Sequence, residues 1–217
     1  ATVRNPQVFL MDEPISHLDA KLKTLMRAEL KRLQKDLDTT TIYVTHDQLE
    51  AISMADRIAI MDFGVLQQIG TPDEIFNKPV NIFVAGFVGS PPMNFFDCEV
   101  INKGGEVLLY GNGFEVKAPS SFSSKLKDIT LKSFMMGIRP GDFIPNRKAS
   151  EENNLIKGEV IVTEPLGDEM ILNVKVGDVI AKVKASIDFQ TEMGDIVGLG
   201  INYKRFYIFD KGTGKVI

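Results

Sequence analysis

This 217-residue chain has little cysteine and no long apolar run. Its single cysteine, Cys98, cannot form a disulfide within the chain, which fits a reducing cytoplasm. No stretch approaches the roughly 20 apolar residues that a membrane-spanning helix needs, and no secretory signal peptide is recognisable. We therefore expect any role at a membrane to depend on docking to other subunits.

An excess of positive charge is also missing. The formal net charge is −4, with nine Lys and Arg against twelve Asp and Glu in residues 1–90, and sixteen against seventeen in residues 91–217. Nucleic-acid-binding surfaces are basic, so we expect no nucleic-acid partner. Hydrophobic residues (44%) and charged residues (25%) occur at the frequencies of a globular protein, and the length suits two domains.

The chain also lacks a Gly-x-x-x-x-Gly-Lys-Ser/Thr phosphate loop. Its glycine-rich stretches, Gly104-Gly105 and Gly111-Asn112-Gly113, lie between predicted strands and have no Lys-Ser after them. They are interpreted as turns. The backbone cradle and the lysine that grip nucleotide phosphates are therefore absent from this sequence.

The strongest pattern that is present is the run Val8–Met11 followed by Asp12-Glu13-Pro14. Four consecutive apolar residues predict a strand buried on both faces, as in the middle of a parallel sheet. In open α/β sheets, ligands bind at the carboxyl ends of strands. Magnesium bound to phosphates takes one or two carboxylates. Asp12 and Glu13 are therefore either part of such a site or a solvated acidic turn.

A predicted helix and a second strand follow this run. Ser16 or Asp19 is a candidate N-cap for a helix whose leucines recur at helical spacing over Leu22–Leu37, with a solvated basic face. Thr41–Val44 predicts a second buried strand. Thr45-His46-Asp47 comes next, and Asp47 can cap the following helix.

The first half ends with a third strand and a hairpin. Arg57–Asp62 predicts the strand, the turn Phe63-Gly64 follows, and Val65–Ile69 predicts the return strand. Thr71 is then a predicted N-cap, with proline at the first helical position. Alternation of strands and helices indicates an α/β sandwich.

The composition changes between Gly86 and Asn94, where Gly89-Ser90-Pro91-Pro92 predicts a linker. We therefore divide the chain into residues 1–90 and 91–217. Short strand-like runs between turns then predict a small barrel or sandwich. These runs are Asp97–Asn102, Val107–Tyr110, Phe114–Lys117, Lys132–Ile138, Ile156–Val162, Met170–Val176, Val179–Lys184, Ile196–Asn202 and Phe206–Phe209.

The order of motifs in residues 1–90 resembles the second half of an ABC-transporter ATPase domain. The strand ending at Asp12 matches the Walker B strand of that family, Ser16 to Asp19 match its D-loop, and His46 matches its switch histidine. Residues 1–6 resemble the end of the helix after the signature motif, although no Leu-Ser-Gly-Gly-Gln occurs. The resemblance thus implies a C-terminal fragment of a longer ATPase.

The second half resembles the sugar-importer branch of this family, the maltose- and glycerol-phosphate-type subunits. Phe83–Phe95 is similar to the connector of that branch, and Gly137–Pro140 and Glu164–Gly167 are similar to its OB-like regulatory domain. The implied fold class is α/β, with a partial P-loop NTPase domain followed by an all-β OB-like domain. The choice of a sugar over a polyamine or an inorganic anion depends mainly on Ser90 to Phe95.

The resemblance also implies roles for individual residues. Asp12 would hold Mg²⁺ directly or through water, Glu13 would accept the proton of the attacking water, and His46 would bond the γ-phosphate of ATP. Ser16 and Asp19 would contact the ATP site across a pair of ATPase subunits. The alternatives are an ordinary exposed acid for Glu13, a structural histidine for His46, and a simple helix cap for Ser16 and Asp19. His17 stands where the family usually has asparagine, and we expect no catalytic duty for it.

The implied function is that of an ATP-hydrolysing subunit that powers import of a sugar or related solute. Its expected partners are a second ATPase subunit in a homodimer or mixed pair, transmembrane permease subunits and a possible regulatory protein, at the cytoplasmic face of the membrane. The alternative is a non-catalytic regulatory or dimerisation fragment of that subunit. An OB-type oligonucleotide binder is disfavoured by the charge of residues 91–217.

Overall fold

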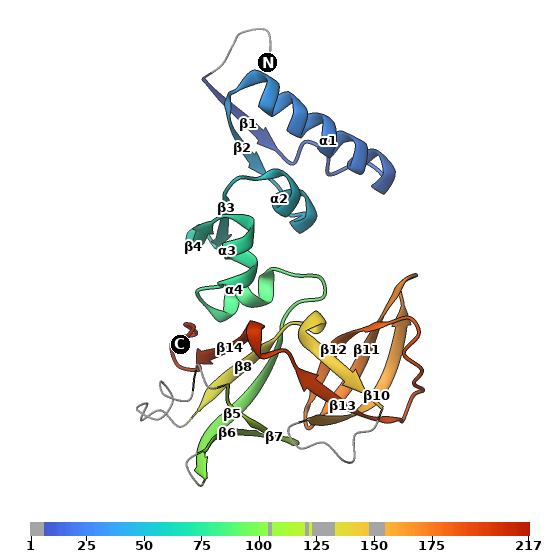
Figure 1. The fold of residues 1–217 in the computed structure, drawn as a ribbon. Coiled ribbons are helices and arrows are strands. Elements are labelled where there is room, and N and C mark those ends of the chain that lie inside the picture. The colour runs from blue at the N-terminus through green and yellow to red at the C-terminus, as the bar shows by residue number, and fades with distance from the viewer. Residues whose placement is uncertain (1–6, 104–105, 120–121, 123–132, 148–154) are drawn as a thin grey trace. The chain divides into compact units, whose positions relative to one another are not determined.

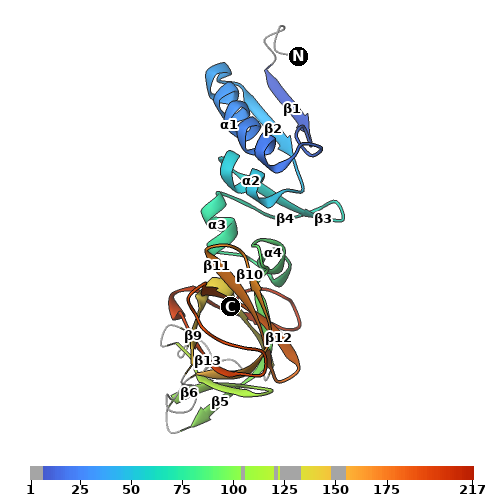
Figure 2. The ribbon, with the colours of Figure 1, turned by 90° about the vertical axis from the view of Figure 1, so that its right-hand side faces the viewer.

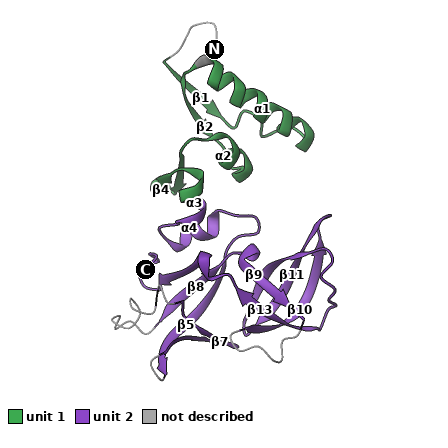
Figure 3. Ribbon diagram, viewed as in Figure 1, with its two compact units in different colours: residues 1–75 green, residues 76–217 purple. Residues whose placement is uncertain are grey.

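The computed structural model describes residues 7–103, 106–119, 122, 133–147 and 155–217, and it divides into two compact units. Unit 1 is residues 1–75 and unit 2 is residues 76–217 (Figure 3). This division falls before the expected boundary after Ser90, because helix α4 (Ile82–Phe87) groups with unit 2. The assignment of residues 1–90 and 91–217 to an ATPase part and a regulatory domain stays a prediction.

Unit 1 begins with a β-α-β unit. Strands β1 (Val8–Asp12) and β2 (Thr40–Val44) are parallel, and helix α1 (Ala20–Leu37) connects them (Figure 1). Helix α2 (Gln48–Met54) follows β2. Strands β3 (Ile58–Asp62) and β4 (Val65–Gly70) form the predicted hairpin, which is a separate two-stranded sheet. Helix α3 (Pro72–Asn77) follows the hairpin and runs across the division between the units.

The helices of unit 1 begin at capping residues. Of the two candidates for α1, Asp19 is the N-cap and accepts a hydrogen bond from the Leu22 amide at 3.0 Å. Asp47 caps α2, as predicted, by accepting from two amides of its first turn. Thr71 and Glu74 form a reciprocal capping box before α3, in which the Thr71 amide donates to Glu74 Oε2 at 2.8 Å. These caps fix where each helix starts.

The prediction that the Val8–Met11 strand is buried on both faces is wrong for the described structure. Leu10 is 74% exposed and Val8 is also exposed, whereas Phe9 and Met11 are half-buried. The physical reason is that a strand is covered on both faces only inside a larger sheet with helices on either side. Among the described residues, β2 is the only strand that pairs with β1.

Besides α4, unit 2 contains two five-stranded antiparallel sheets (Figures 1 and 2). The first has the order β14-β8-β5-β6-β7 and the second the order β12-β11-β10-β13-β9. The first comprises β5 (Asn94–Lys103), β6 (Glu106–Gly111), β7 (Phe114–Lys117), β8 (Phe134–Ile138) and β14 (Phe206–Asp210). The second comprises β9 (Phe143–Asn146), β10 (Ile156–Pro165), β11 (Glu169–Val176), β12 (Val179–Ser186) and β13 (Ile196–Ile201). Short 3-10 turns at Pro140–Asp142 and Tyr203–Arg205 precede β9 and β14.

Most of the predicted strands of unit 2 are confirmed in place, with shifts only at their ends. Strand β9 was missed, because its four residues include Pro145 and a proline argues against a strand. The structure accommodates Pro145 because β9 lies at the edge of its sheet. The predictions for Ala1–Pro6, Gly104-Gly105 and Lys132 fall outside the described residues.

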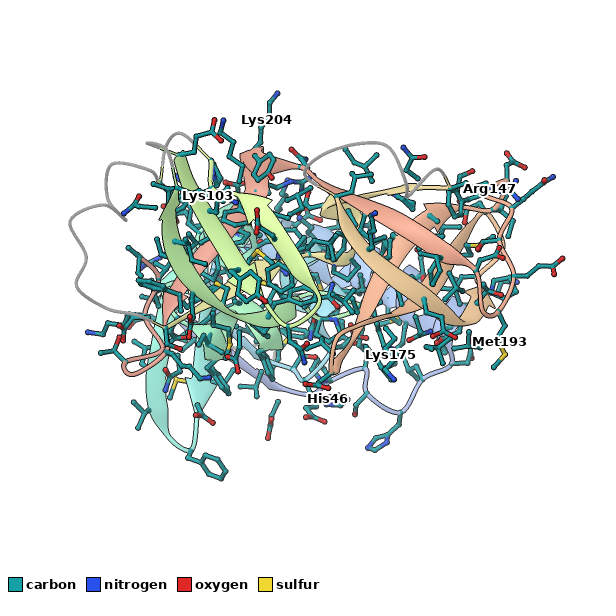
Figure 4. All side chains as sticks on the ribbon, turned by 90° about the horizontal axis from the view of Figure 1, so that it is seen from below. His46, Lys103, Arg147, Lys175, Met193 and Lys204 are labelled. Carbon is teal, nitrogen blue, oxygen red and sulfur yellow. The ribbon has the colours of Figure 1, made fainter. Side chains whose placement is uncertain are left out.

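One apolar core joins the two sheets. Phe96 of β5 packs edge-on against Phe114 of β7 and Phe143 of β9, with ring centroids 5.7 and 6.3 Å away. Leu172, Val174 and Val176 of β11 are buried in this core. Figure 4 places Lys103 and Lys204 beside the first sheet and Arg147 and Met193 at the outer rim of the second.

Asn94 also joins the sheets. Its Oδ1 accepts a hydrogen bond from the Lys182 amide at 2.7 Å, and its Nδ2 donates to the Lys182 carbonyl at 2.8 Å. The amide side chain thus gives the edge strand β12 the pair of bonds that a neighbouring strand would give it. This contact protects part of an otherwise open sheet edge.

The structure has a larger share of β structure than the predicted α/β fold class implies. An α/β arrangement is limited to β1, α1 and β2, whereas the strands of unit 2 make the described chain mainly β. No helix within the described residues is long and apolar enough to cross a membrane.

Candidate functional site

The register of β1 against β2 brings the two predicted catalytic residues to one place. Asp12 pairs with Val44, and the Glu13 amide donates to the Val44 carbonyl at 2.9 Å, one residue beyond β1. His46 follows Val44 by two residues. Because carboxyl ends of parallel strands meet at one edge of a sheet, Glu13 and His46 lie side by side.

Glu13 and His46 are in direct contact. Glu13 Oε1 lies 2.8 Å from His46 Nδ1. The Glu13 backbone has φ +43°, in the left-handed region that costs a residue other than glycine about 1 kcal/mol. The Ser16 hydroxyl donates to the Glu13 carbonyl at 3.1 Å and holds this bend. Strained backbone of this kind recurs at functional sites.

The contact changes the titration of the histidine. The hydrogen bond with Glu13, and then the negative charge of Glu13, raise the pKa of His46 above 6.5. Both side chains remain open to solvent. A protonated imidazole carries hydrogens on both ring nitrogens. With Nδ1 directed to Glu13, the other nitrogen, Nε2, can then donate to an anion.

A buried network supports the loop that carries His46, and sequence reasoning missed it. Glu50 is only 2% exposed and accepts hydrogen bonds from the Tyr43 hydroxyl at 2.9 Å and from Thr45 Oγ1 at 2.8 Å. Thr45 Oγ1 in turn accepts from the Asp47 amide at 2.9 Å. Burial and the contact with Glu50 raise the pKa of Tyr43, so its hydroxyl stays a donor. The network fixes the residues on both sides of His46.

One sequence signal points to Glu50. It follows the N-cap Asp47 by three residues, which is the spacing of a capping box. In the structure its carboxylate turns to Tyr43 and Thr45. The spacing therefore marks the residue, whereas its partners depend on how α2 lies against the end of β2.

The other predicted site residues lie around the same turn. Asp12 is exposed at the end of β1, and Asp19 Oδ1 is engaged as the cap of α1. Ser16 is half-buried and bonded to the Glu13 carbonyl. His17 is exposed. Within the chain, Ser16 and Asp19 therefore have structural partners, and a contact with a second subunit stays a prediction.

The described residues contain no group of three or more His, Cys, Asp and Glu side chains that could hold a metal ion. Magnesium bound together with a nucleotide needs only one or two carboxylates, because phosphates and water supply its remaining ligands. The exposed carboxylate of Asp12 fits that smaller requirement. Asp12 can therefore contribute to a shared site, but the described side chains do not form a complete one.

The Glu13–His46 contact can be tested by titration. We expect the pKa of His46 to lie above 6.5 and to fall towards that value in a Glu13→Gln variant, because the amide removes the negative charge. The raised pKa implies that the stabilisation from this pair is complete below about pH 6.5, and is lost as the pH rises through the folded-state pKa. NMR titration of the histidine ring signals measures both values.

The sequence provides the control for this titration. The chain has two histidines, so a His17→Asn background leaves a single signal to follow. An unchanged His46 pKa in the Glu13→Gln variant would show that the two groups do not interact in solution.

Comparison with known proteins gives consistent matches. Residues 89–143 match the family model of the MalK OB-fold domain. The chain is 46% identical to the trehalose/maltose import ATP-binding protein MalK of Thermococcus litoralis, over 100% of this chain and 59% of that protein. It is 41% identical to the multiple sugar-binding transport ATP-binding protein MsmK of Streptococcus mutans, over 100% of this chain and 60% of that protein. It is 40% identical to the sn-glycerol-3-phosphate import ATP-binding protein UgpC of Psychromonas ingrahamii, over 100% of this chain and 57% of that protein. The chain thus spans somewhat more than half the length of these relatives.

Proposed function

Because this chain belongs to the family of ABC import ATP-binding subunits that carry a MalK-type OB-fold domain, we propose that it is part of a subunit that hydrolyses ATP to power solute import. The observation that carries the catalytic part of this proposal is the Glu13–His46 contact at the end of the parallel strands. Residues 1–90 would then be the second part of a P-loop ATPase domain, and residues 91–217 its OB-like regulatory domain.

The geometry suits hydrolysis by an activated water. As the water oxygen bonds to the γ-phosphorus and the bond to ADP breaks, the water proton passes to the Glu13 carboxylate. His46 holds Glu13 through Nδ1 and, when protonated, donates from Nε2 to a phosphate oxygen. Asp12 would hold the Mg²⁺ of the nucleotide, which neutralises phosphate charge. The groups that would stabilise the charge that develops in the reaction therefore all lie at one edge of the sheet.

The partners of the complete subunit follow from the same membership. Ser16 and Asp19 would face the ATP site of a second ATPase subunit, identical or paired, and permease subunits would form the membrane path. A regulatory protein could dock on the OB-like domain. The subunit would work at the cytoplasmic face of the membrane.

The relatives support a sugar or related solute. Their names refer to trehalose and maltose, to multiple sugars and to sn-glycerol-3-phosphate. The alternative is that the 217-residue chain acts only as a regulatory or dimerisation module. It is favoured by the missing phosphate loop and by the large share of the chain in unit 2.

A nucleotide titration separates the two functions. We expect the 217-residue chain to bind ATP weakly or not at all and not to hydrolyse it, because it carries no phosphate loop. A version extended at the N-terminus to the length of the relatives should bind ATP saturably and hydrolyse it. Saturable hydrolysis by the 217-residue chain, abolished by Glu13→Gln, would contradict the first expectation. An extended version without ATP binding would overturn the proposed function.

A further inference from the structure

The residues from Phe76 to Pro92, here called the connector, start before the Phe83–Phe95 stretch of the sequence comparison and are bonded to the rest of unit 2. The sequence predicts a linker at Gly89–Pro92, but the structure buries much of the segment just before it. Val84, Ala85 and Val88 are almost completely buried. The connector is thus part of unit 2, and the division between the two units falls before Phe76.

Arg139 makes the central contacts. Arg139 is 3% exposed, and its side chain contacts Phe76 in α3 and Val88 directly after α4. Its Nη1 donates to the Val88 carbonyl at 2.6 Å, and its Nη2 donates to the Phe76 carbonyl at 2.5 Å. The guanidinium carbon also lies 3.9 Å from the centre of the Phe76 ring. A planar, forked donor can satisfy two carbonyls and stack on a ring at once, which a lysine cannot do.

Gly89 makes room for this arrangement. Its φ of +123° is a conformation that residues with a side chain rarely adopt. A Cβ atom at this position would lie 2.9 Å from Arg139 Nη1. The glycine of the predicted linker therefore allows the backbone to approach Arg139 closely.

Bonds from the C-terminal part of the chain hold the connector as well. The Tyr207 hydroxyl donates to the Asn77 carbonyl at 3.0 Å. The Ile82 amide donates to the Gly214 carbonyl at 2.8 Å, and the Val216 amide donates to the Val80 carbonyl at 3.1 Å. Among these contacts, Arg139 is the one that binds both ends of the segment.

We infer that Arg139 is a positioning residue that holds the connector and the sheets of unit 2 together as one body, so that a conformational change in the sheets moves Phe76, the residue at which the chain leaves unit 1. The contacts themselves do not depend on the proposed function, whereas the regulatory consequence rests on it. The two carbonyls that Arg139 binds belong to unit 2, whereas Glu13 and His46 belong to unit 1. The effect of Arg139 on ATP turnover would therefore be one of coupling.

Hydrogen–deuterium exchange of the 217-residue chain tests the contact. Arg139→Met keeps much of the apolar stem but leaves the Phe76 and Val88 carbonyls without their charged donor. We expect amide exchange in residues 80–88 to rise by about tenfold or more, while exchange in β10 and β11 stays unchanged. Arg139→Lys should restore little of the protection, because one ammonium cannot reproduce the two-pronged contact. Lys175→Met, an exposed site on β11, is the control and should leave residues 80–88 unchanged.

Two results would overturn the inference about the contact. An equal rise of exchange throughout unit 2 would make Arg139 a general stability residue. No rise in residues 80–88 would show that the connector is held without it.

The regulatory consequence is tested in the complete subunit. Deletion of Asn94–Ile217 is expected to change dimerisation and basal ATP turnover, and Arg139→Met should reproduce the change in turnover. A deletion that alters turnover when Arg139→Met does not would overturn the coupling. A complete subunit with no ATP turnover in any form would instead refute the proposed function, and the exchange result would be unaffected.

Discussion

Glu13→Gln in the complete subunit is expected to lower ATP hydrolysis by about 10²- to 10⁴-fold and to leave ATP binding in place. Glutamine keeps the shape of the side chain and can still meet His46, but it cannot accept the proton of the attacking water. The phosphate-binding groups are not altered. Steady-state phosphate release and a nucleotide titration on the same preparation measure the two quantities.

The matched control for this variant is His17→Asn, four residues further along the same turn. His17 is exposed and has no predicted catalytic duty, so the control should hydrolyse ATP at close to the wild-type rate. A Glu13→Gln subunit with near-normal turnover would move the base to another group, with His46 the next candidate. Loss of ATP binding would show that Glu13 also contributes to binding ATP before hydrolysis.

Phe96→Ala is expected to destabilise unit 2 by about 3–5 kcal/mol, because the buried ring leaves a cavity between the two sheets. Phe96 is 1% exposed and contacts aromatic rings of both sheets, through Phe114 and Phe143. Urea unfolding followed by far-ultraviolet circular dichroism measures the free energy of unfolding.

Tyr110→Ala is the control for the core variant. Tyr110 belongs to the same sheet but is half exposed, so its removal should cost no more than about 0.5–1 kcal/mol. If the two variants unfold at the same urea concentration, the Phe96 ring does not stabilise the packing of the two sheets.

Short strand-like runs between turns carried most of the fold prediction in unit 2. In β11, the apolar Leu172, Val174 and Val176 are buried, but the polar Asn173 is buried as well, because it donates to Glu164 Oε1 at 2.6 Å. A buried amide with a carboxylate partner has the sequence appearance of a solvent-facing residue. The pattern therefore locates the strand but does not decide the burial of each polar side chain.

Helix α4 could not be predicted in the same way. Ile82–Phe87 has apolar residues at nearly every position and only six residues, so it shows no helical period. Its N-cap, Asn81, accepts from the Val84 amide at 2.9 Å. The helix is stabilised by its burial in unit 2, which a local sequence pattern does not contain.

The site was predictable where it depends on strand order and not where it depends on packing. The ends of two parallel strands are known once the strands are known, which is why the Glu13–His46 neighbourhood follows from the sequence. The hydrogen bonds of Glu50 and the two carbonyl contacts of Arg139 join residues whose approach is set by tertiary structure. The spacing of residues in the sequence does not predict which groups Glu50 and Arg139 contact.

The most direct test of the central claim, that Glu13 and His46 act together in ATP hydrolysis, is a double-mutant cycle on the turnover rate of the complete subunit. The measurement compares wild type, Glu13→Gln, His46→Ala and the double variant. If the two residues act as one unit, the double variant will be about as slow as the slower single variant. If the two losses multiply, or if His46→Ala leaves the rate unchanged, the residues do not act together and the claim is contradicted.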